Sequence, residues 1–308
     1  MTTAVTRDAV DRVLEMLAGR GVRDHPIGPL TTYRVGGEAA AFTVIDDEAG
    51  LELVARAVSE TGVEVLVLGK GSNLLIAEAG FSGLVVQLGE GFSSIDVDAG
   101  SARAVSGAGA AYPVLARRSA AAGLTGLEWA VGVPGSVGGA VRMNAGGHGS
   151  DTSSKLVCAR VVDLLCGADS EVAASGLELS YRHSSIADHQ LVVSASFALQ
   201  VSERDSCEAQ ISEVVRWRRL NQPGGQNAGS VFTNPAGGSA GRLVDAAGLK
   251  GLRVGSAEVS RKHANFIQAD ADGSADDVAR LIAEVQRLVE QRLGVGLTPE
   301  VRMIGFAP

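Results

Sequence analysis

Hydrophobic residues change their spacing along the chain, and each change predicts a new element. Near the start, Val10, Val13, Leu14 and Leu17 repeat at the spacing of one helix face, which predicts a short helix that ends near Gly19. The same stretch carries acidic residues and lacks the basic start and apolar block of a signal peptide. No apolar run approaches the roughly 18 residues that would cross a bilayer.

From about residue 31 the pattern alternates between strands and a helix. Residues 31–46 predict a strand, a glycine turn and a second strand, and residues 47–62 predict a helix. Residues 63–69 and 83–89 predict strands again. This alternation is typical of an α/β arrangement.

The remainder of the chain predicts a helix, a strand-rich region and a change of domain. An alanine-rich helix is expected at residues 110–123, and strand hairpins are expected over residues 155–201. A polar helix then leads to Pro223, which with the glycines after it marks the entrance to a second domain. The last helix is expected to start at a Ser274 cap. Its apolar stripe consists of Val278, Leu281, Ile282, Val285, Leu288 and Val289.

Composition and charge exclude several classes of protein. The 308-residue chain is 45% hydrophobic and 20% charged, which excludes a disordered polyelectrolyte and predicts two or three packed units. The net charge of −8 provides no overall field for nucleic acid or an anionic membrane, so any anion site must be built locally. Cys158, Cys166 and Cys207 have neither C-x-x-C spacing nor the density of a secreted scaffold. We therefore expect a protein of the reducing cytoplasm.

Glycine is over-represented, with 40 residues, and gathers in a few loops. The first loop, residues 69–73, follows a predicted strand, and its closely spaced glycines let consecutive N–H groups converge on an anion. Ser72 and Asn73 can add donors. Both a phosphate cradle and an ordinary turn fit this loop. It matches neither the Walker pattern nor a G-x-G-x-x-G fingerprint, which disfavours a Rossmann site.

A second loop, residues 126–151, is the most glycine-rich part of the chain, with seven glycines between Gly132 and Gly149. A backbone with so few bulky side chains can approach a large flat ligand, and residues 133–139 offer several N–H groups. A tight packing corner is the alternative. Because the run is long and repeats the features of the first loop, it favours a cofactor that contains a diphosphate.

Four side chains outside these loops could take part in chemistry. Arg182 lies between apolar strand residues and needs a carboxylate, phosphate or aromatic partner, and Glu300 is costly to bury without a proton role. Each could instead form a structural ion pair. Ser230 stands where a loop can present its hydroxyl to a cleft, but a lone serine is more often a satisfied surface hydroxyl. His263 fits a core residue, and the histidines show no metal-ligand spacing, so no metal is predicted.

Eight motifs follow one another in an order and at intervals that point to a known family. They are TTYRVGG, LGKGSNLLI with GFSGLVV, GLEWAVGVPGSVGGAVRMNAGGHG, YRHS, QPGGQNAGSVFTNP, AGRLVDAAGLKG, VSRKHANFI and TPEVRMIG. With them, residues 25–308 resemble the UDP-N-acetylenolpyruvoylglucosamine reductases, also called UDP-N-acetylmuramate dehydrogenases, which are flavoenzymes of bacterial cell-wall synthesis. The GVPGSVGGAV and GSVFTNP segments are the most specific.

The resemblance implies an α+β chain with an FAD-binding fold of the vanillyl-alcohol-oxidase type. Two α/β subdomains would enclose the flavin, and a smaller α+β substrate-binding domain would follow them. The expected ranges are 1–28 for an N-terminal helix and lead-in, 29–202 for the FAD-binding domain and 203–308 for the substrate-binding domain. The resemblance also implies FAD, NADPH as electron donor and a UDP-sugar substrate. Neither His25 nor His148 lies in an attachment motif, so we expect the FAD to be non-covalent. No obligate protein partner is evident from the sequence, and a cytoplasmic enzyme is expected.

Site residues are carried over from the family at the positions that match its motifs. Arg182 matches the active-site arginine, Ser230 the proton donor and Glu300 the active-site glutamate. Residues expected near FAD are Thr32, Tyr33, Arg34, Gly69, Lys70, Gly71, Ser72, Asn73, Leu74, Val133, Pro134, Gly135, Ser136, Gly138, Gly139, Ala140, Asn144, Ala145 and Gly146. Residues expected to contact substrate are Tyr181, Arg218, Asn234, Lys250 and His263, with Arg219 as the alternative to Arg218.

The chemistry that the resemblance implies suits these residue types. A hydride from NADPH would pass through the flavin to the β-carbon of an enolpyruvyl ether, leaving negative charge on the α-carbon and its carboxylate. Arg182 would bind the carboxylate, a protonated Glu300 would donate a hydrogen bond to the enolate, and Ser230 would protonate the α-carbon. The 48 positions from Arg182 to Ser230 indicate the compact type of the family, and His148 replaces an aromatic residue at one flavin contact.

Two other functions remain open from the sequence. A different FAD-dependent oxidoreductase of the same fold, acting on a hydroxy acid or alcohol, would explain the glycine-rich loops but not GSVFTNP or PEVRMIG. A non-catalytic flavin- or nucleotide-binding protein would have no need to keep Arg182, Ser230 and Glu300 together. The three possibilities differ in whether an enolpyruvyl substrate reoxidises the flavin.

Overall fold

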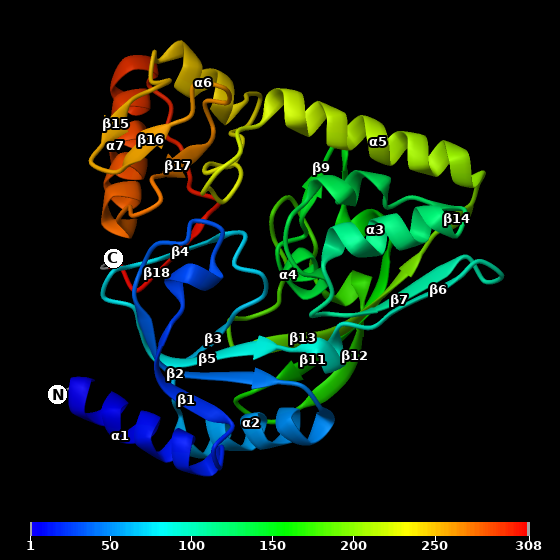
Figure 1. The fold of residues 1–308 in the computed structure, drawn as a ribbon, viewed down its shortest axis with the longest axis vertical. Helices are drawn as coiled ribbons and strands as arrows, with labels where there is room; N and C mark the ends of the chain where they lie inside the picture. The colour runs from blue at the N-terminus through cyan, green and yellow to red at the C-terminus, as the bar shows by residue number, and fades with distance from the viewer. Residues whose placement is uncertain (1, 307–308) are drawn as a thin grey trace. The chain divides into compact units, whose positions relative to one another are not determined.

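The computed structural model describes residues 2–306, with side chains from residue 7 onward. By its internal contacts the chain divides into two compact units, each described separately here (Figure 1). Unit 1 contains Met1–Asp24, Ala40–Lys70 and Ser82–Arg218, and unit 2 contains His25–Ala39, Gly71–Phe81 and Arg219–Pro308. Two short N-terminal segments therefore pack with the C-terminal part of the chain. The domain ranges expected from the sequence stay a prediction.

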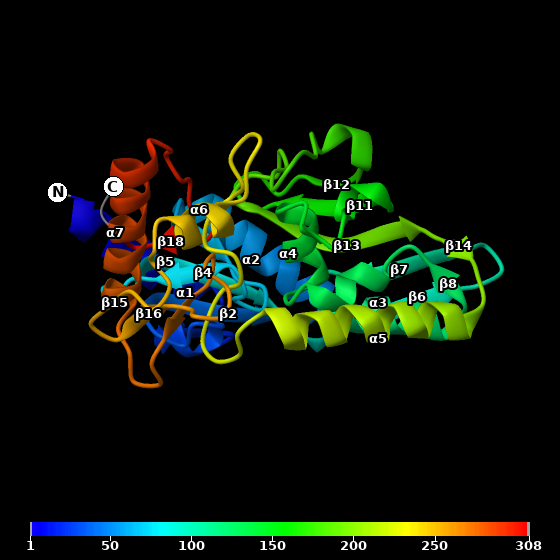
Figure 2. The same cartoon turned by 90° about the horizontal axis from the view of Figure 1, so that it is seen from above.

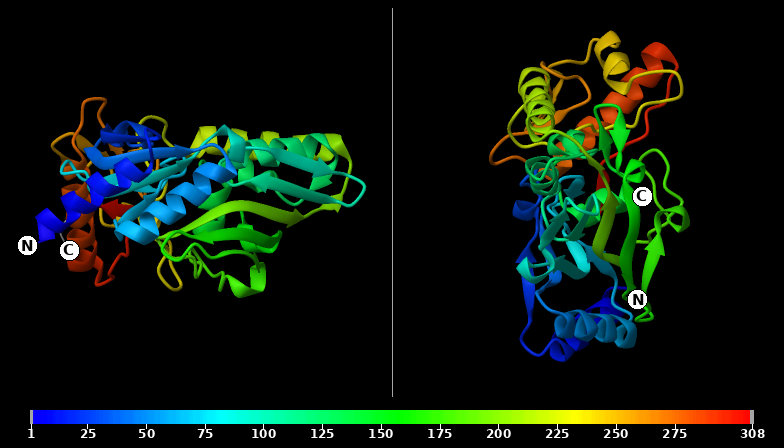
Figure 3. Two further views of the ribbon diagram at one scale, coloured as in Figure 1. Left: turned by 90° about the horizontal axis from the view of Figure 1, so that it is seen from below. Right: turned by 90° about the vertical axis from the view of Figure 1, so that its right-hand side faces the viewer.

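Unit 1 contains a four-stranded sheet with two helices against it. The sheet order is β1 (Gly21–Pro26), β2 (Glu38–Ile45), β5 (Phe81–Leu88) and β3 (Val65–Val67). Two helices, α1 (Thr2–Met16) and α2 (Glu48–Thr61), lie side by side along this sheet (Figures 1 and 3). Their buried faces and the strands form one hydrophobic core, which includes Val13, Val54 and Leu84.

Local signals set the ends of α2. The Asp47 carboxylate accepts a hydrogen bond from the Gly50 N–H at 2.6 Å and so caps the first turn. Gly62 ends the helix in the left-handed conformation, at φ 63°, and its N–H donates to the Val58 carbonyl. The sequence-based expectation of a helix at residues 47–62 is confirmed.

A second sheet of unit 1 is antiparallel and lies under three helices. Its order is β12 (Asp169–Ala173), β11 (Leu156–Asp163), β13 (Gln190–Ala198), β7 (Arg103–Gly107) and β6 (Ile95–Asp98). The helices are α3 (Tyr112–Ala121), α4 (Val137–Arg142) and α5 (Arg204–Asn221), and α5 runs alongside α3 (Figure 2). Their apolar faces share one core with the sheet. Two small pairs complete the unit, namely β8 (Leu124–Thr125) with β14 (Gln200–Val201) and β9 (Gly146–Gly147) with β10 (Ser150–Asp151).

Unit 2 packs helices on a small antiparallel sheet. The sheet order is β15 (Arg253–Val254), β16 (Ala257–Val259) and β17 (Ile267–Ala269), and α7 (Ala275–Leu293) packs along it (Figure 1). The short helix α6 (Ala240–Ala246) joins the same core. A parallel pair formed by β4 (Leu74–Ile76) and β18 (Arg302–Ile304) brings the loop after β3 next to the C-terminal strand.

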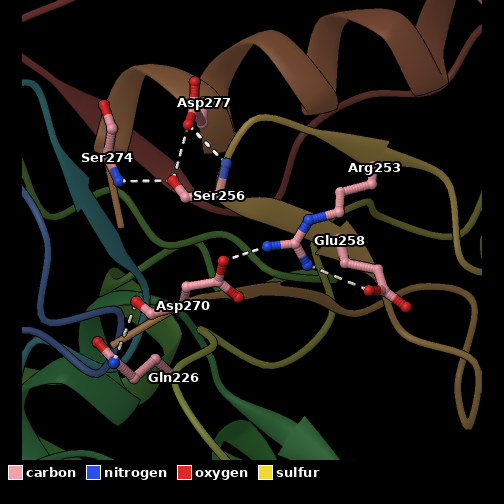
Figure 4. Close-up of polar contacts among 7 residues, drawn as sticks. All are labelled: Gln226, Arg253, Ser256, Glu258, Asp270, Ser274 and Asp277. Atoms are coloured by element: carbon pink, nitrogen blue, oxygen red, sulfur yellow. Dashed lines mark hydrogen bonds and ion pairs between the residues drawn. The ribbon is translucent and has the colours of Figure 1, made fainter. Parts of the chain in front are cut away.

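A polar network fixes the turn between β15 and β16 in unit 2 (Figure 4). One oxygen of Asp277 accepts hydrogen bonds from both the N–H and the hydroxyl of Ser256 at 2.7 Å, and the Ser256 hydroxyl accepts one from the Ser274 N–H at 2.8 Å. The carboxylate lies so close that a Cβ on Gly255 would be 2.1 Å from it. Because Gly255 also has a φ of 54°, the turn requires glycine for two separate reasons.

Most predicted helices are confirmed, including the N-terminal helix, the alanine-rich helix and the last helix, where the Ser274 hydroxyl caps the first turn. One predicted strand, at the start of residues 31–46, is wrong. The Thr31 hydroxyl donates to the Gly28 carbonyl at 2.8 Å and accepts from the Arg34 N–H at 3.1 Å, so this segment turns instead of pairing. The helix α4 was not predicted, because glycine is a poor helix former.

The Gly255 turn yields a prediction about stability. We expect Gly255→Ala to lower the free energy of unfolding by more than Gly294→Ala does. Gly294 ends α7 at φ 68°, and no other atom lies within 4 Å of the place that a methyl group would take, so alanine there costs only the left-handed conformation, about 1–2 kcal/mol. At Gly255 the methyl group would in addition displace the Asp277 carboxylate. Urea unfolding of both variants measures the difference, and equal losses would contradict the packing described above.

Candidate functional site

The two glycine-rich loops of the sequence meet in unit 1. A Cβ on Gly69 would lie 2.5 Å from the Ser136 hydroxyl oxygen, so only glycine allows this approach. The Gly69 carbonyl accepts a hydrogen bond from the Gln87 side chain at 2.8 Å. The Ser136 hydroxyl accepts the Gly139 N–H at 3.2 Å and caps α4. The structure therefore brings together two stretches that were expected from the sequence to bind the same cofactor.

Peptide N–H groups in the second loop are mostly used within the protein. The N–H groups of Val133, Val137 and Gly138 donate to the carbonyls of Ala130, Ala110 and Ala108, in that order. The Gly139 N–H donates to the Ser136 hydroxyl, and the Ala140 N–H donates to the Ser136 carbonyl. For the N–H groups of Gly135 and Ser136, no acceptor is found among residues 2–306. These two groups are thus the ones in this stretch that remain to bind an anion.

The rest of the first loop belongs to unit 2. Gly71, at φ 63°, packs so closely on the main chain of Leu30 and Thr31 that a Cβ would lie 2.4 Å from the Leu30 carbonyl oxygen. The Gly71 carbonyl accepts the Thr32 N–H at 3.0 Å. The Asn73 side chain donates to the Glu300 carbonyl at 3.1 Å, and the Asn73 carbonyl accepts the Arg302 N–H at 3.0 Å. Hydrogen bonds therefore join this loop both to the TTYR motif and to the C-terminal residues Glu300 and Arg302.

Tyr33 and Arg34, both expected near FAD, differ in their surroundings. The Tyr33 side chain is fully buried in the core of unit 2, and this burial raises the pKa of its hydroxyl well above the ordinary value. Arg34 is exposed and adopts a φ of 57°. In this conformation Tyr33 supports the core, and only Arg34 presents its side chain to solvent.

Arg182 is oriented by two segments of unit 1. Its Nη2 donates to the Gly146 carbonyl at 2.9 Å, and its guanidinium carbon lies 5.2 Å from the centre of the Tyr181 ring. Asn144 is 1% exposed, and its side chain bridges the two segments: Nδ2 donates to the Ser180 carbonyl at 2.8 Å and Oδ1 accepts the Ser153 N–H at 2.9 Å. The Asn144 side chain therefore helps to fix residues 180–183, the turn that carries Arg182.

Arg218 lies near the tip of the β9–β10 hairpin. The His148 ring there contacts the Trp217 ring edge to face, with 5.0 Å between ring centres. Burial lowers the pKa of His148, and the charge of Arg218 lowers it further. Burial also lowers the pKa of Arg218 itself. His148 is thus favoured in its neutral form, and Trp217, which was not among the residues expected from the sequence, supplies the aromatic ring at this place.

Ser230 and Glu300 are neighbours in unit 2, on two segments joined by main-chain hydrogen bonds. The Glu300 N–H donates to the Val231 carbonyl at 2.7 Å, and Phe232 forms an antiparallel bridge with Pro299. Both Ser230 and Glu300 are partly exposed. Two of the three predicted catalytic residues therefore lie on adjacent segments, with Val231 opposite Glu300, although 70 positions separate Ser230 and Glu300 in the sequence.

The predicted substrate contacts Asn234 and Lys250 of unit 2 bond to the two ends of α6, and His263 lies close to Lys250. The Asn234 side chain accepts the Ala240 N–H at 3.0 Å, and Lys250 pairs with Asp245 at 2.6 Å. The His263 ring packs on Phe266 with 4.7 Å between ring centres. Burial lowers the pKa of His263, and the nearby charge of Lys250 lowers it further. The neutral form of the His263 imidazole is therefore favoured, next to the Lys250–Asp245 ion pair.

Within the part of the chain that the structure describes, no group of histidine, cysteine, aspartate and glutamate side chains could bind a metal ion. No helix among these residues is both long and apolar enough to cross a membrane.

Two family models match different parts of the chain. The model described as UDP-N-acetylenolpyruvoylglucosamine reductase, C-terminal domain, matches residues 220–304. The model described as FAD binding domain matches residues 39–167.

Similar proteins match over nearly the whole length. A UDP-N-acetylenolpyruvoylglucosamine reductase of Rubrobacter xylanophilus is 39% identical over 300 residues, which cover 96% of this chain and 99% of that protein. A reductase of the same name from a Synechococcus species is 42% identical over 308 residues and covers 96% and 97% of the two chains. The crystal structure of the Thermus caldophilus UDP-N-acetylenolpyruvylglucosamine reductase is 34% identical, with a TM-score of 0.79 over 92% of this chain and 98% of that chain.

The Lys250–His263 contact yields a prediction about titration. We expect Lys250→Met to raise the pKa of His263, because the substitution removes the neighbouring positive charge. The pKa should still stay below its ordinary value of 6.5, since burial is the larger cause and persists. Histidine NMR titration measures the shift, with His148 as an internal control whose pKa should not change. A His263 pKa that falls or stays constant would show that the two residues do not interact.

Proposed function

The chain belongs to the UDP-N-acetylenolpyruvoylglucosamine reductase family, and we propose that it reduces UDP-N-acetylglucosamine enolpyruvate to UDP-N-acetylmuramate with NADPH as the electron donor. It is an FAD-dependent oxidoreductase of peptidoglycan synthesis, and its FAD-binding fold of the vanillyl-alcohol-oxidase type with a separate C-terminal domain is as expected from the sequence. A cytoplasmic location would give the enzyme access to both NADPH and the nucleotide sugar.

The residues present suit the diphosphate of FAD. In unit 1, the Gly69 backbone approaches Ser136 where a side chain would intrude, and the N–H groups of Gly135 and Ser136 are directed to no protein acceptor among residues 2–306. An anion bound by such N–H groups needs no positive side chain. This agrees with a chain whose net charge is −8 and whose anion sites must be local. We therefore assign FAD phosphate contacts to Gly69, Gly135 and Ser136.

The single observation that carries the proposed chemistry is the main-chain hydrogen bond from the Glu300 N–H to the Val231 carbonyl in unit 2, which brings Ser230 and Glu300 onto adjacent segments. Bound FAD would supply the redox chemistry that relays a hydride from NADPH to the β-carbon of the enolpyruvyl group. The negative charge that develops on the α-carbon and carboxylate then needs hydrogen-bond donors and a proton. Ser230 supplies the proton, and Glu300 in its acid form donates a hydrogen bond to the enolate oxygen.

Arg182 binds the substrate carboxylate in this proposal. A guanidinium can donate two parallel hydrogen bonds to a carboxylate, which orients the group as well as neutralising it. The Gly146 carbonyl accepts a hydrogen bond from Nη2 and the Tyr181 ring packs on the guanidinium, so the guanidinium has a defined orientation. This preorganisation lowers the entropic cost of orienting the carboxylate.

The nucleotide part of the substrate is assigned to the remaining predicted contacts. Lys250 and His263 lie together beside α6, and Lys250 offers positive charge to the diphosphate. Arg218 of unit 1 stays a predicted substrate contact. Tyr181 is 55% exposed, so its ring can pack against a base or sugar. Asn234 contributes its amide from the loop that carries Ser230.

The role of Ser230 can be tested by separating the two halves of the reaction. We expect Ser230→Ala to retain flavin reduction by NADPH but to lose most of the flavin reoxidation by the enolpyruvyl substrate, with a loss of about 10²–10⁴-fold, because only the second half needs a proton donor. Stopped-flow absorbance of the flavin follows both halves.

The matched control is Ser212→Ala, which removes an exposed helix hydroxyl bonded to the Glu208 carbonyl. This variant should leave both halves unchanged. Normal reoxidation in Ser230→Ala would refute Ser230 as the proton donor. A simultaneous loss of flavin reduction would instead indicate a structural effect on the cofactor site.

A further inference from the structure

Asn265 forms hydrogen bonds with main-chain groups of residues 230–233, here called the Ser230 segment, in the way that a paired strand would. Its main-chain carbonyl accepts the Val231 N–H at 2.8 Å. Its side-chain oxygen accepts the Phe232 N–H at 3.0 Å, and its side-chain nitrogen donates to the Phe232 carbonyl at 2.8 Å. Asn265 is 4% exposed and Phe232 is 2% exposed, so these hydrogen bonds are shielded from water. One amide thus satisfies both buried main-chain groups of Phe232.

The opposite edge of the same segment is joined to residues 298–300, which precede β18. The Val231 carbonyl accepts the Glu300 N–H, and the Thr233 N–H donates to the Thr298 carbonyl at 2.9 Å. The segment is therefore enclosed between Asn265 and residues 298–300. Without the Asn265 amide, the Phe232 N–H and carbonyl would lose their partners in a buried position, and the segment would have to shift to regain them.

The loop before Ser230 is also fixed by amide side chains. The Asn227 side-chain oxygen accepts the Gly229 N–H at 3.0 Å. Gln226 bonds to β17 through its main-chain carbonyl, which accepts the Ala269 N–H, and its side chain donates to the Asp270 carbonyl at 3.2 Å (Figure 4). Ser230 is thus the residue between an anchored loop and the Asn265 clamp. The position of Ser230 therefore depends on the hydrogen bonds on both sides.

From these contacts we propose that Asn265 is a positioning residue, whose side-chain amide places the Ser230 hydroxyl relative to Glu300. The inference rests on the proposed function of Ser230 as proton donor. Asn265 itself does not act on the substrate, and it acts through the backbone of residues 231–232. The reaction is sensitive to this placement, since a shift of about 1 Å at a reacting group can cost about 10²-fold in rate.

The test is a double-mutant cycle on flavin reoxidation. Wild type, Asn265→Ala, Ser230→Ala and the double variant are reduced with NADPH and mixed anaerobically with the enolpyruvyl substrate. We expect Asn265→Ala to slow reoxidation by about 10²-fold and to leave flavin reduction unchanged. In the Ser230→Ala background the same substitution should add almost nothing, because the group that it positions is already absent.

Two further variants separate positioning from general destabilisation. Leu281→Ala truncates a fully buried residue of α7 in the same core and should lower the melting temperature without a selective loss of reoxidation. Asn265→Asp keeps the shape and the acceptor for the Phe232 N–H but replaces the donor with an oxygen that repels the Phe232 carbonyl, so reoxidation should also be slower than in wild type. It provides the same test if the alanine variant does not fold. The Asn265 main-chain N–H, which donates to the His263 ring at 3.3 Å, remains in both variants.

The outcomes distinguish this inference from the function on which it rests. If Ser230→Ala reoxidises normally, the proposed function fails. If Ser230→Ala is slow but Asn265→Ala is as fast as wild type, or slows the Ser230→Ala enzyme by the same factor as wild type, the positioning role is overturned. A loss in Leu281→Ala equal to that in Asn265→Ala would overturn it as well, because stability alone would then explain the effect.

Discussion

The hydrogen bond from the Glu300 N–H to the Val231 carbonyl is the contact on which the catalytic part of unit 2 depends. It joins the segment that carries Ser230 to the segment that carries Glu300, just before β18. The strand β18 pairs with β4, and Asn73 bonds to this C-terminal stretch through both its side chain and its carbonyl. Main-chain pairing thereby fixes the segments that carry Asn73, Ser230 and Glu300, the last two being the proposed proton donor and acid.

In each unit, a buried asparagine side chain also joins segments that are distant in sequence. Asn144 links the Arg182 turn to the β9–β10 hairpin, and Asn265 in unit 2 clamps the Ser230 segment. An asparagine amide presents one donor and one acceptor in the arrangement of a peptide group, so it can substitute for a strand neighbour where no strand continues. Such a buried amide is costly to remove because its partners have no access to water. The side-chain amides of Asn144 and Asn265 therefore take the place of a main-chain hydrogen-bonding partner.

Local signals made much of the fold predictable from sequence. The helix α2 is bounded by the Asp47 cap and Gly62, and α7 by Ser274 and Gly294, all within a few residues of the helices that they define. The segment after residue 31 was mispredicted because the Thr31 hydroxyl provides a turn that apolar spacing does not reveal. The division into units was equally hidden, since it depends on residues 71–81 pairing with the C-terminal strand.

The candidate site was predictable as a set of residues but not as a set of contacts. Motif order named Arg182, Ser230 and Glu300, whereas nothing near Asn265 in sequence indicates that its partners lie 33 positions away. Asn144 was assigned to FAD from its motif, and only the structure shows its amide engaged with Ser180 and Ser153. A long-range contact made by one polar side chain cannot be predicted from hydrophobic periodicity, because it does not alter the spacing of apolar residues.

The most direct test of the central claim is an anaerobic redox cycle with the unmodified protein. Its flavin absorbance, at roughly 450 nm for this cofactor, is first bleached with a stoichiometric amount of NADPH, and UDP-N-acetylglucosamine enolpyruvate is then added. Return of the yellow colour together with formation of UDP-N-acetylmuramate is the result expected of a reductase in which Arg182, Ser230 and Glu300 act on the enolpyruvyl group. A flavin that stays bleached after the substrate is added, and recovers only when oxygen is admitted, would contradict the account.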